Sequence, residues 1–198
     1  MIAVIKATGA NFSSVRFALQ RLGVESLVTD SRDVIATASH VIMPGVGSAG
    51  AAMAKLHAAG LVDVIRQLEQ PVLGICLGMQ LMFEMSEEGD TPGLGLFGGR
   101  VKALTFADGY PVPHMGWNRV TYLGGATPAP DGWAYFVHSY AAPVGPDTIA
   151  TTTYAEPFSA IVARDNFVGV QFHPERSADF GSRLLSRFLK DTRIPVLL

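Results

Sequence analysis

The chain of 198 residues has little cysteine, little charge and no long apolar run. Its single cysteine, Cys76, cannot form an internal disulfide, which favours a reducing compartment. Only 16% of the residues are charged, the formal net charge is −2 and no Lys/Arg run appears, so no feature indicates nucleic-acid binding. The longest apolar segment, residues 72–83, is too short and too mixed to span a bilayer, and the N-terminus lacks a signal-peptide pattern. We therefore expect a cytoplasmic protein.

The chain is rich in apolar residues, and segments with the periodicity of strands alternate with segments that have the periodicity of helices. Hydrophobic residues make up 48% of it, and its length predicts one domain over residues 1–198. The first half predicts strands at residues 2–5, 24–28, 41–43 and 71–75, and helices at 12–22, through 51–56 (capped by Ser48), at 61–68 and at 77–84. This alternation favours a parallel sheet covered on both faces. After Gly89, segments 120–122, 135–137, 160–162 and 168–170 predict antiparallel strands before a final helix at about 178–189.

Cys76 lies in the sequence Gly74-Ile75-Cys76-Leu77-Gly78, between a predicted buried strand and a predicted helix. That layout is typical of a nucleophile elbow, in which flanking glycines let strand and helix approach closely. The thiol then projects at the carboxyl end of a parallel strand and at a helix N-terminus, which favours thiolate. The Leu77 amide points the same way and is suited to holding an oxyanion. The alternative is an inert buried cysteine.

His173-Pro174-Glu175 supplies the base that such a thiol needs. Residues two apart in an extended segment point to the same side, so the Glu175 carboxylate can orient the His173 imidazole. The alternative is a loop histidine beside a solvated glutamate. Of the other histidines, His40 and His57 are expected at the surface. No pair has metal-ligand spacing on a helix, so we expect no metal site.

Residues 44–47 form a Pro-Gly-Val-Gly segment between a predicted strand and a predicted helix. It lacks the lysine of a phosphate-binding loop. Its exposed amides favour a second wall of an oxyanion hole, and a plain turn is the alternative. Two segments rich in aromatic residues, 113–118 and 135–140, are explained either by core packing or by an interface.

The elbow through Gln80, together with His173-Pro174-Glu175, resembles the class I (triad) glutamine amidotransferases. Segments 44–47, 113–118, 135–140 and 169–177 are similar to those of the glutaminase subunits of imidazole glycerol phosphate synthases, in histidine biosynthesis. The resemblance runs from the first predicted strand to the last predicted helix. It implies a single-domain, flavodoxin-like α/β fold with a mostly parallel central sheet flanked by helices and added antiparallel strands.

The resemblance also implies the chemistry. Cys76 attacks the glutamine side-chain amide, His173 moves the proton, and Glu175 orients His173. Leu77, Gly45, Val46 and Gly47 would form the oxyanion hole. Glutamine would be held by Gln80, Glu84, His138, Ser139 and Tyr140. Ammonia would pass to a (β/α)₈-barrel cyclase subunit that makes imidazole glycerol phosphate and aminoimidazole carboxamide ribonucleotide. The residues facing that subunit would be Trp117, Asn118, Tyr135 and Arg176. No cofactor is implied.

Two residues depart from the pattern. Lys6 stands where many relatives carry Asp, and Arg176 stands where Lys is also common. Arginine makes planar forked contacts that a lysine does not, so an interface ion pair would be rebuilt. Three alternatives stay open: a glutaminase serving another synthase, such as in anthranilate or pyridoxal phosphate synthesis, a catalytically silent regulatory module, and a peptide-cleaving cysteine hydrolase. Segment 113–118 argues against a glutaminase of another synthase. The intact Cys-His-Glu set argues against a silent module, and Gln80 argues against a peptide-cleaving hydrolase.

Overall fold

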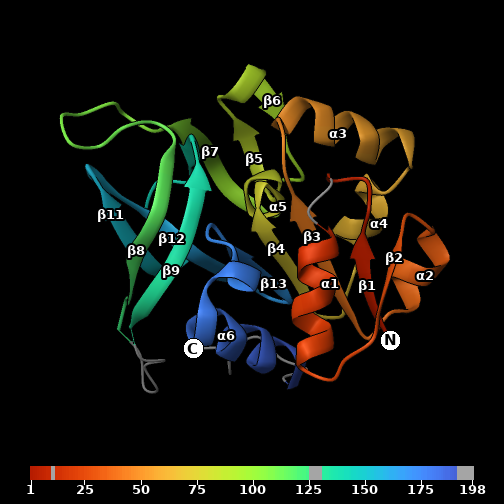
Figure 1. Ribbon diagram of the computed structural model, residues 1–198. Helices are drawn as coiled ribbons and strands as arrows, with labels where there is room; N and C mark the ends of the chain where they lie inside the picture. Colours follow the sequence, from red (N-terminus) through yellow and green to blue (C-terminus); the bar gives the residue numbers. More distant parts are fainter. Residues whose placement is uncertain (10–11, 125–130, 191–198) are drawn as a thin grey trace.

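The computed structural model describes residues 1–9, 12–124 and 131–190 (Figure 1). These residues form two sheets and the helices that pack on them. The larger sheet contains β1 (Ile2–Ile5), β2 (Ser26–Thr29), β3 (His40–Gly45), β4 (Val72–Cys76), β8 (His114–Tyr122), β9 (Gly132–His138), β11 (Thr148–Tyr154), β12 (Glu156–Arg164) and β13 (Phe167–Val170). The smaller sheet contains β5 (Phe83–Ser86), β6 (Thr91–Pro92), β7 (Phe97–Ala103) and β10 (Tyr140–Ala141).

The helices up to residue 81 alternate with the strands of the first half, as the periodicity predicts, and one more helix follows β13. They are α1 (Phe12–Arg21), α2 (Arg32–Thr37), α3 (Ala49–Ala58), α4 (Val62–Arg66), α5 (Leu77–Leu81) and α6 (Ala178–Lys190), with 3₁₀ turns η1 (Glu88–Asp90) and η2 (Pro174–Arg176). The short helix α2 and strands β5, β6, β7, β10 and β11 have no counterpart among the predicted elements.

The larger sheet has two halves of different character. Its strand order is β2-β1-β3-β4-β13-β12-β11-β8-β9. From β2 to β13 every pairing is parallel, and from β13 to β9 every pairing is antiparallel. The predicted architecture is therefore correct, although the sheet is parallel only in one half. Strand β13 joins the halves, because it runs parallel to β4 and antiparallel to β12.

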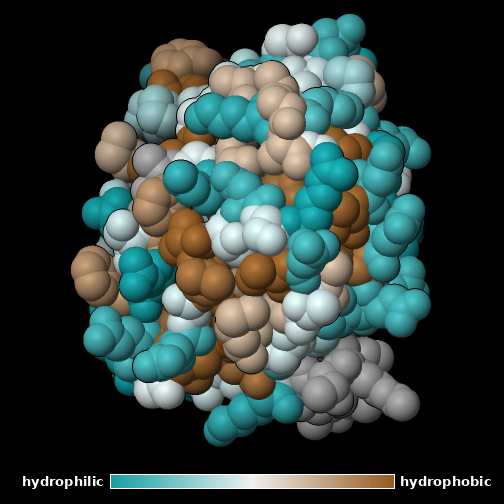
Figure 2. All heavy atoms as spheres, turned by 90° about the vertical axis from the view of Figure 1, so that its right-hand side faces the viewer, coloured by the Kyte–Doolittle hydropathy of each residue, from teal (hydrophilic) through white to brown (hydrophobic). Residues whose placement is uncertain are grey.

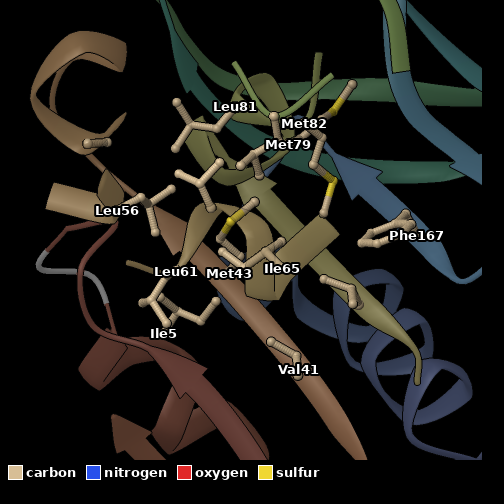
Figure 3. Close-up of a cluster of buried hydrophobic side chains, with 14 of the residues drawn as sticks. Ile5, Val41, Met43, Leu56, Leu61, Ile65, Met79, Leu81, Met82 and Phe167 are labelled. Carbon is tan, nitrogen blue, oxygen red and sulfur yellow. The ribbon is translucent and has the colours of Figure 1, made fainter. Parts of the chain in front are cut away.

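The parallel half is buried on both faces. Ile2 and Val4 of β1 pack with α1 and α6, whereas Ala3 and Ile5 pack with the helices of the opposite face. On that opposite face, Leu56, Ile65 and Met79 belong to one buried apolar cluster with Met43 of β3 (Figure 3). Each such buried side chain contributes roughly 1.5–3 kcal/mol relative to exposure. Alternate residues of one strand thus hold both helical layers to the sheet, which explains the continuous apolar runs of β1 and β4.

The helix predicted at residues 77–84 ends early, at Leu81. The carbonyls of Leu81 and Met82 accept hydrogen bonds from Leu94 N–H (2.7 Å) and Leu96 N–H (2.8 Å). Phe83 then begins β5, which pairs in parallel with β7. A segment more than ten residues away along the chain therefore donates hydrogen bonds to the carbonyl groups that would otherwise continue the helix. The helix propensity of residues 77–84 gives no sign of this competing segment.

The surface on the side that carries α2 and β2 mixes apolar residues with a hydrophilic surround (Figure 2). His40, expected at the surface, is instead only 8% exposed, and its ring lies edge-on to Phe188, 5.3 Å between centroids. It is buried because α6 covers the end of β3. No described helix is long and apolar enough to cross a membrane.

Candidate active site

Cys76 is the last residue of β4, and α5 begins at the next residue. Its backbone takes φ 53° and ψ −110°, a sparsely populated conformation for a residue with a side chain. Such strain costs about 1–3 kcal/mol and persists only where the surroundings impose it. The flanking glycines explain how the turn fits. A Cβ on Gly78 would lie 1.8 Å from the Met43 carbonyl oxygen, and one on Gly74 would lie 2.8 Å from the Met79 nitrogen.

Three neighbouring parallel strands bring the reactive segments together. In the order β3-β4-β13, Gly45 ends the first strand, Cys76 ends the second, and His173 follows the third. Carboxyl ends of parallel strands share one edge of the sheet, where α/β proteins place their ligands. The predicted oxyanion segment, nucleophile and base therefore meet at one edge.

His173 and Glu175 are in direct contact, as their spacing predicts. His173 Nδ1 lies 2.8 Å from Glu175 Oε1, and the two side chains are 5% and 0% exposed. His173 is extended (φ −96°, ψ 97°), and Pro174 starts η2, which turns Glu175 back toward the ring. The backbone is anchored as well, because His173 N–H donates to the Tyr135 carbonyl at 2.9 Å. The carboxylate thus holds Nδ1 and leaves Nε2 for chemistry.

Electrostatics favour the protonated imidazole. Burial lowers the pKa of His173, but hydrogen bonding and opposite charge from Cys76 and Glu175 outweigh it and raise the pKa to about 10. By geometric criteria, His173 Nε2 makes no hydrogen bond within the described residues. Catalytic hydrogen bonds are often long in a free enzyme and tighten with substrate. The arrangement is suited to a thiolate–imidazolium pair.

A cavity of about 690 Å³ opens over these groups. That volume is in the range of small-molecule sites. Its lining unites most of the predicted site residues: Gly45, Val46, Gly47, Cys76, Leu77, Gln80, His138, Ser139, Tyr140, His173 and Arg176. An apolar cavity beneath α6, of about 30 Å³, has room for about one water molecule and is too small for an amino acid.

Glu84, predicted to hold substrate, does not line the cavity. Because α5 ends at Leu81, Glu84 falls on β5, where it is exposed and accepts a hydrogen bond from Gly99 N–H at 2.9 Å. Glu88 of η1 lines the cavity instead. Its carboxylate accepts from Ala49 N–H at 2.7 Å, the first residue of α3, whereas Ser48 makes no side-chain capping bond. A carboxylate at this position complements the positive end of the helix.

Gln171 is a polar residue of the site that sequence reasoning missed. It is fully buried, and its Nε2 lies 3.7 Å from the Cys76 sulfur. Its Oε1 accepts from Gln80 Nε2 at 3.0 Å. Gln171 lies two residues before His173, so the spacing argument that pairs His173 with Glu175 could also have pointed to Gln171.

The segment at residues 44–47 packs directly on the elbow. A Cβ on Gly45 would lie 2.7 Å from the Gly78 nitrogen, so only glycine allows this approach. The buried Thr8 hydroxyl donates to the Pro44 carbonyl, which anchors the start of the segment. Val46 is 40% exposed and Gly47 has φ +97°, so the rest of the segment lies at the cavity mouth. Gly45 is the register partner of Cys76 in the β3–β4 pairing, so the segment adjoins the nucleophile.

Aromatic residues and a cation stand beside the cavity. Trp117 is 51% exposed and meets Tyr135 edge-on, with 6.1 Å between ring centroids. The Arg176 guanidinium lies 4.9 Å from the centre of the Tyr135 ring, a cation–π distance. Asn118 is half-buried, and its amide nitrogen donates to the Thr153 carbonyl at 3.0 Å. Among the described residues no cluster of His, Cys, Asp or Glu is arranged to hold a metal ion.

The fold and the site define a glutaminase of the triad type, and the chain belongs to the class I glutamine amidotransferases. The family described as "Glutamine amidotransferase class-I" matches residues 4–192. Its relatives include the "Imidazole glycerol phosphate synthase subunit HisH" of Xylella fastidiosa, 53% identical over 96% of both chains. The subunit of the same name from Pasteurella multocida is 47% identical over 97% of this chain and 98% of that one.

Solved structures show the same fold at lower identity. A "glutamine amidotransferase" covers 96% of this chain and 97% of its own with a TM-score of 0.76 and 19% identity. A "putative gmp synthase subunit a protein" from Thermoplasma acidophilum covers 96% of this chain and 92% of its own with a TM-score of 0.70 and 18% identity.

Proposed function

We propose that this chain is the glutaminase subunit of an imidazole glycerol phosphate synthase, the role that HisH has in its relatives. The full-length similarity to those subunits carries the assignment to this synthase. The Cys76 elbow beside the buried His173–Glu175 pair supports turnover and argues against a silent regulatory module. The proposal takes residues 1–198 as one glutamine amidotransferase domain that works in the cytoplasm.

The geometry supports the following reaction. The Cys76 thiolate attacks the side-chain carbonyl carbon of glutamine, and the oxyanion accepts hydrogen bonds from Leu77 N–H and from the segment at Gly45, Val46 and Gly47. The His173 imidazolium donates its Nε2 proton to the departing nitrogen, which leaves as ammonia. Neutral His173 then takes a proton from water as the water attacks the thioester. Glutamate leaves, and thiolate and imidazolium are restored.

The cavity lining suggests how glutamine is held. Gln80, His138, Ser139 and Tyr140 line the same cavity as Cys76, and we assign them to substrate binding. Glu88 replaces Glu84 in this assignment, because its carboxylate faces the same space. A carboxylate there suits the α-ammonium group of an amino acid.

The partner would be a (β/α)₈-barrel cyclase that consumes the ammonia. Trp117, Asn118, Tyr135 and Arg176 would face it. Trp117 is half exposed, and Arg176 lines the cavity and lies over the Tyr135 ring, so they present aromatic surface with one cation. Aromatic residues and arginine are enriched in interface centres. Arginine at position 176 favours a forked contact with a carboxylate of the cyclase. Lys6 lies outside the cavity lining, so chemistry does not depend on it.

The test combines the chain with the cyclase of the same synthase and compares glutamine with ammonium as nitrogen donor. Cys76→Ala should lower glutamine-dependent synthesis by about 10³-fold or more and leave ammonium-dependent synthesis intact. His57→Gln, an exposed change on α3, is the matched control and should leave both rates unchanged. Equal loss of both rates in Cys76→Ala would contradict the assigned role.

The same experiment tests regulation. The chain alone should hydrolyse glutamine slowly, because the exposed part of the oxyanion segment would take its working geometry only when the loaded cyclase docks. Fast hydrolysis by the chain alone would exclude this dependence. If the chain supported glutamine-dependent synthesis with a different synthase but not with this cyclase, the result would favour the alternative partner.

A further inference from the structure

Two buried histidines, His114 and His138, take no part in the proton transfers of the proposed reaction, and of the two His138 lines the cavity. They lie directly opposite each other on the β8–β9 hairpin. His114 Nδ1 is 3.0 Å from His138 Nε2, and both side chains are buried. A buried histidine pair is costly unless its nitrogens are all satisfied, so the hydrogen-bond direction at each end becomes informative.

The outer end of the pair fixes the tautomer of His114. Arg119 N–H donates to Asn118 Oδ1 at 2.8 Å, so the Asn118 amide can have only one orientation. Its Nδ2 donates to the Thr153 carbonyl and also faces His114 Nε2 at 3.3 Å. His114 Nε2 must therefore accept, and the proton of a neutral ring is on Nδ1.

The inner end repeats the argument. His114 Nδ1–H donates to His138 Nε2, so His138 also carries its proton on Nδ1 and donates to the Tyr140 carbonyl at 2.9 Å. A second proton on either ring would set two N–H groups against each other. Burial lowers the pKa of His114 to about 4 and that of His138 to about 3, which agrees with two neutral rings at neutral pH.

Aromatic packing prevents either ring from turning. The His114 ring is stacked between Tyr154, 3.9 Å away at 25°, and Phe136, 4.9 Å away at 22°. The His138 ring meets Phe158 edge-on at 5.1 Å. The donors of this chain of rings therefore keep one direction, from Asn118 toward Tyr140.

The Tyr140 carbonyl is the point at which this chain reaches the cavity. It accepts from Gln80 Nε2 as well, at 2.7 Å, and the second amide hydrogen of Gln80 goes to Gln171 Oε1. Both hydrogens of the Gln80 amide are thus committed to acceptors. Its Oε1 receives no hydrogen bond within the described residues, and Gln80 lines the cavity. Gln80 consequently offers an acceptor, not a donor, to a ligand.

We propose that His114 and His138 are positioning residues that form a neutral hydrogen-bond relay from Asn118 to the Tyr140 carbonyl. The relay sets that carbonyl, and through it the Gln80 amide, so that Gln80 Oε1 accepts a hydrogen bond from an N–H group of glutamine. The inference rests on the proposed glutaminase function. The relay ends on groups that contact the ligand. Its loss should therefore weaken glutamine binding more than it lowers the reactivity of the Cys76 sulfur.

The kinetic test compares two substitutions at one position, in the complex with the cyclase. His114→Phe keeps a ring between Tyr154 and Phe136 but cannot donate to His138. We expect it to raise the KM for glutamine about tenfold, the loss of one hydrogen bond, with kcat within about threefold of wild type. His114→Gln retains an acceptor and a donor and should restore KM to within about threefold. His57→Gln on the exposed face of α3 is the control.

The spectroscopic test needs no activity. Long-range ¹H–¹⁵N spectra of the chain at pH 7 should show both His114 and His138 as neutral Nδ1–H tautomers. In His114→Phe the His138 nitrogen signals should shift, because Nε2 loses its donor, whereas in His57→Gln they should not.

The outcomes separate the relay from the function on which it rests. No glutamine turnover by the wild-type complex would overturn the proposed function. Normal wild-type turnover with an unchanged KM in His114→Phe would overturn the relay, as would equal defects in His114→Phe and His114→Gln. Should His114→Phe fail to fold, the wild-type spectrum decides, and an Nε2–H or charged form of either histidine at pH 7 overturns the proposal.

Discussion

The parallel and antiparallel halves of the larger sheet contribute differently to the site. The parallel half supplies the reacting groups: Cys76 at the end of β4, the Gly45 segment after β3 and His173 after β13. The antiparallel half supplies none of them, but its strand β9 contacts two of them. The Tyr135 carbonyl accepts a hydrogen bond from His173 N–H, and the Val137 carbonyl oxygen lies 3.7 Å from the Cys76 sulfur.

The difference lies in how each half specifies position. In the parallel half, strand direction alone brings three carboxyl ends to one edge, and glycines permit the close approach. In the antiparallel half, position depends on register and on satisfied buried polar side chains, as in the pair His114 and His138. Chemistry thus resides in one half and its alignment in the other, and substitutions in the two halves should have separable effects.

The largest effect is expected from Glu175→Gln, which alters the reacting groups at the edge of the parallel half. The amide preserves size but removes the negative charge that stabilises the His173 imidazolium. We expect kcat for glutamine-dependent synthesis to fall by about 10²- to 10⁴-fold, the usual contribution of a positioned acid–base group, with little change in KM. Steady-state rates with both nitrogen donors measure it. Glu69→Gln, an exposed change, is the control; an unaltered kcat in Glu175→Gln would exclude Glu175 as the orienting residue.

A smaller effect, on stability instead of rate, tests the packing of the elbow. Gly78→Ala places a Cβ 1.8 Å from the Met43 carbonyl oxygen, so β3 and α5 must separate. We expect a loss of more than about 3 kcal/mol, since a rigid backbone atom cannot move aside. Urea denaturation measures the free energy of unfolding. The control is Gly98→Ala, which meets no atom within 4 Å, and similar losses in both variants would refute the close-approach explanation.

The smallest effect tests the neutral histidines of the antiparallel half through pH. The pKa values of His114 and His138 fall to about 4 and about 3 in the folded chain, from 6.5. Below pH 6.5 the unfolded chain therefore binds protons that the folded chain does not, and stability falls as the pH drops. His173 acts oppositely, because its raised pKa removes stability only as the pH rises from 6.5 toward about 10.

As the pH falls from 6.5 to 5, each of the two neutral histidines should lower the free energy of unfolding by about 1.6 kcal/mol. His114→Gln removes one titrating ring, so its stability should fall by about 1–2 kcal/mol less than that of wild type over this range. Urea denaturation at several pH values measures the slope. His57→Gln, with an exposed ring, should retain the wild-type slope, and equal slopes in all three proteins would show that the buried pair does not titrate on unfolding.

Much of the site could be predicted from sequence because its signals are local. Gly74 and Gly78 around Cys76 mark a tight strand-to-helix turn. The close spacing of His173 and Glu175 predicts their contact, although the turn η2 makes it and not an extended segment. Glu84 shows the limit: four residues beyond Gln80 it continues a helical period, but hydrogen bonds from Leu94 and Leu96 end α5 before it. Glu88 enters the cavity through η1, and no periodicity indicates that.

The sequence by itself determined the reactive groups, the alternation that builds the parallel half and the glycines that the elbow needs, because each depends on residues within a few positions of one another. Only the tertiary structure decided where α5 stops, that Glu88 lines the cavity and Gln171 contacts the sulfur, and that His114 and His138 align their protons in one direction. Those features depend on which distant backbone and side-chain groups compete for a given hydrogen bond, and that competition is settled only when the strands pair.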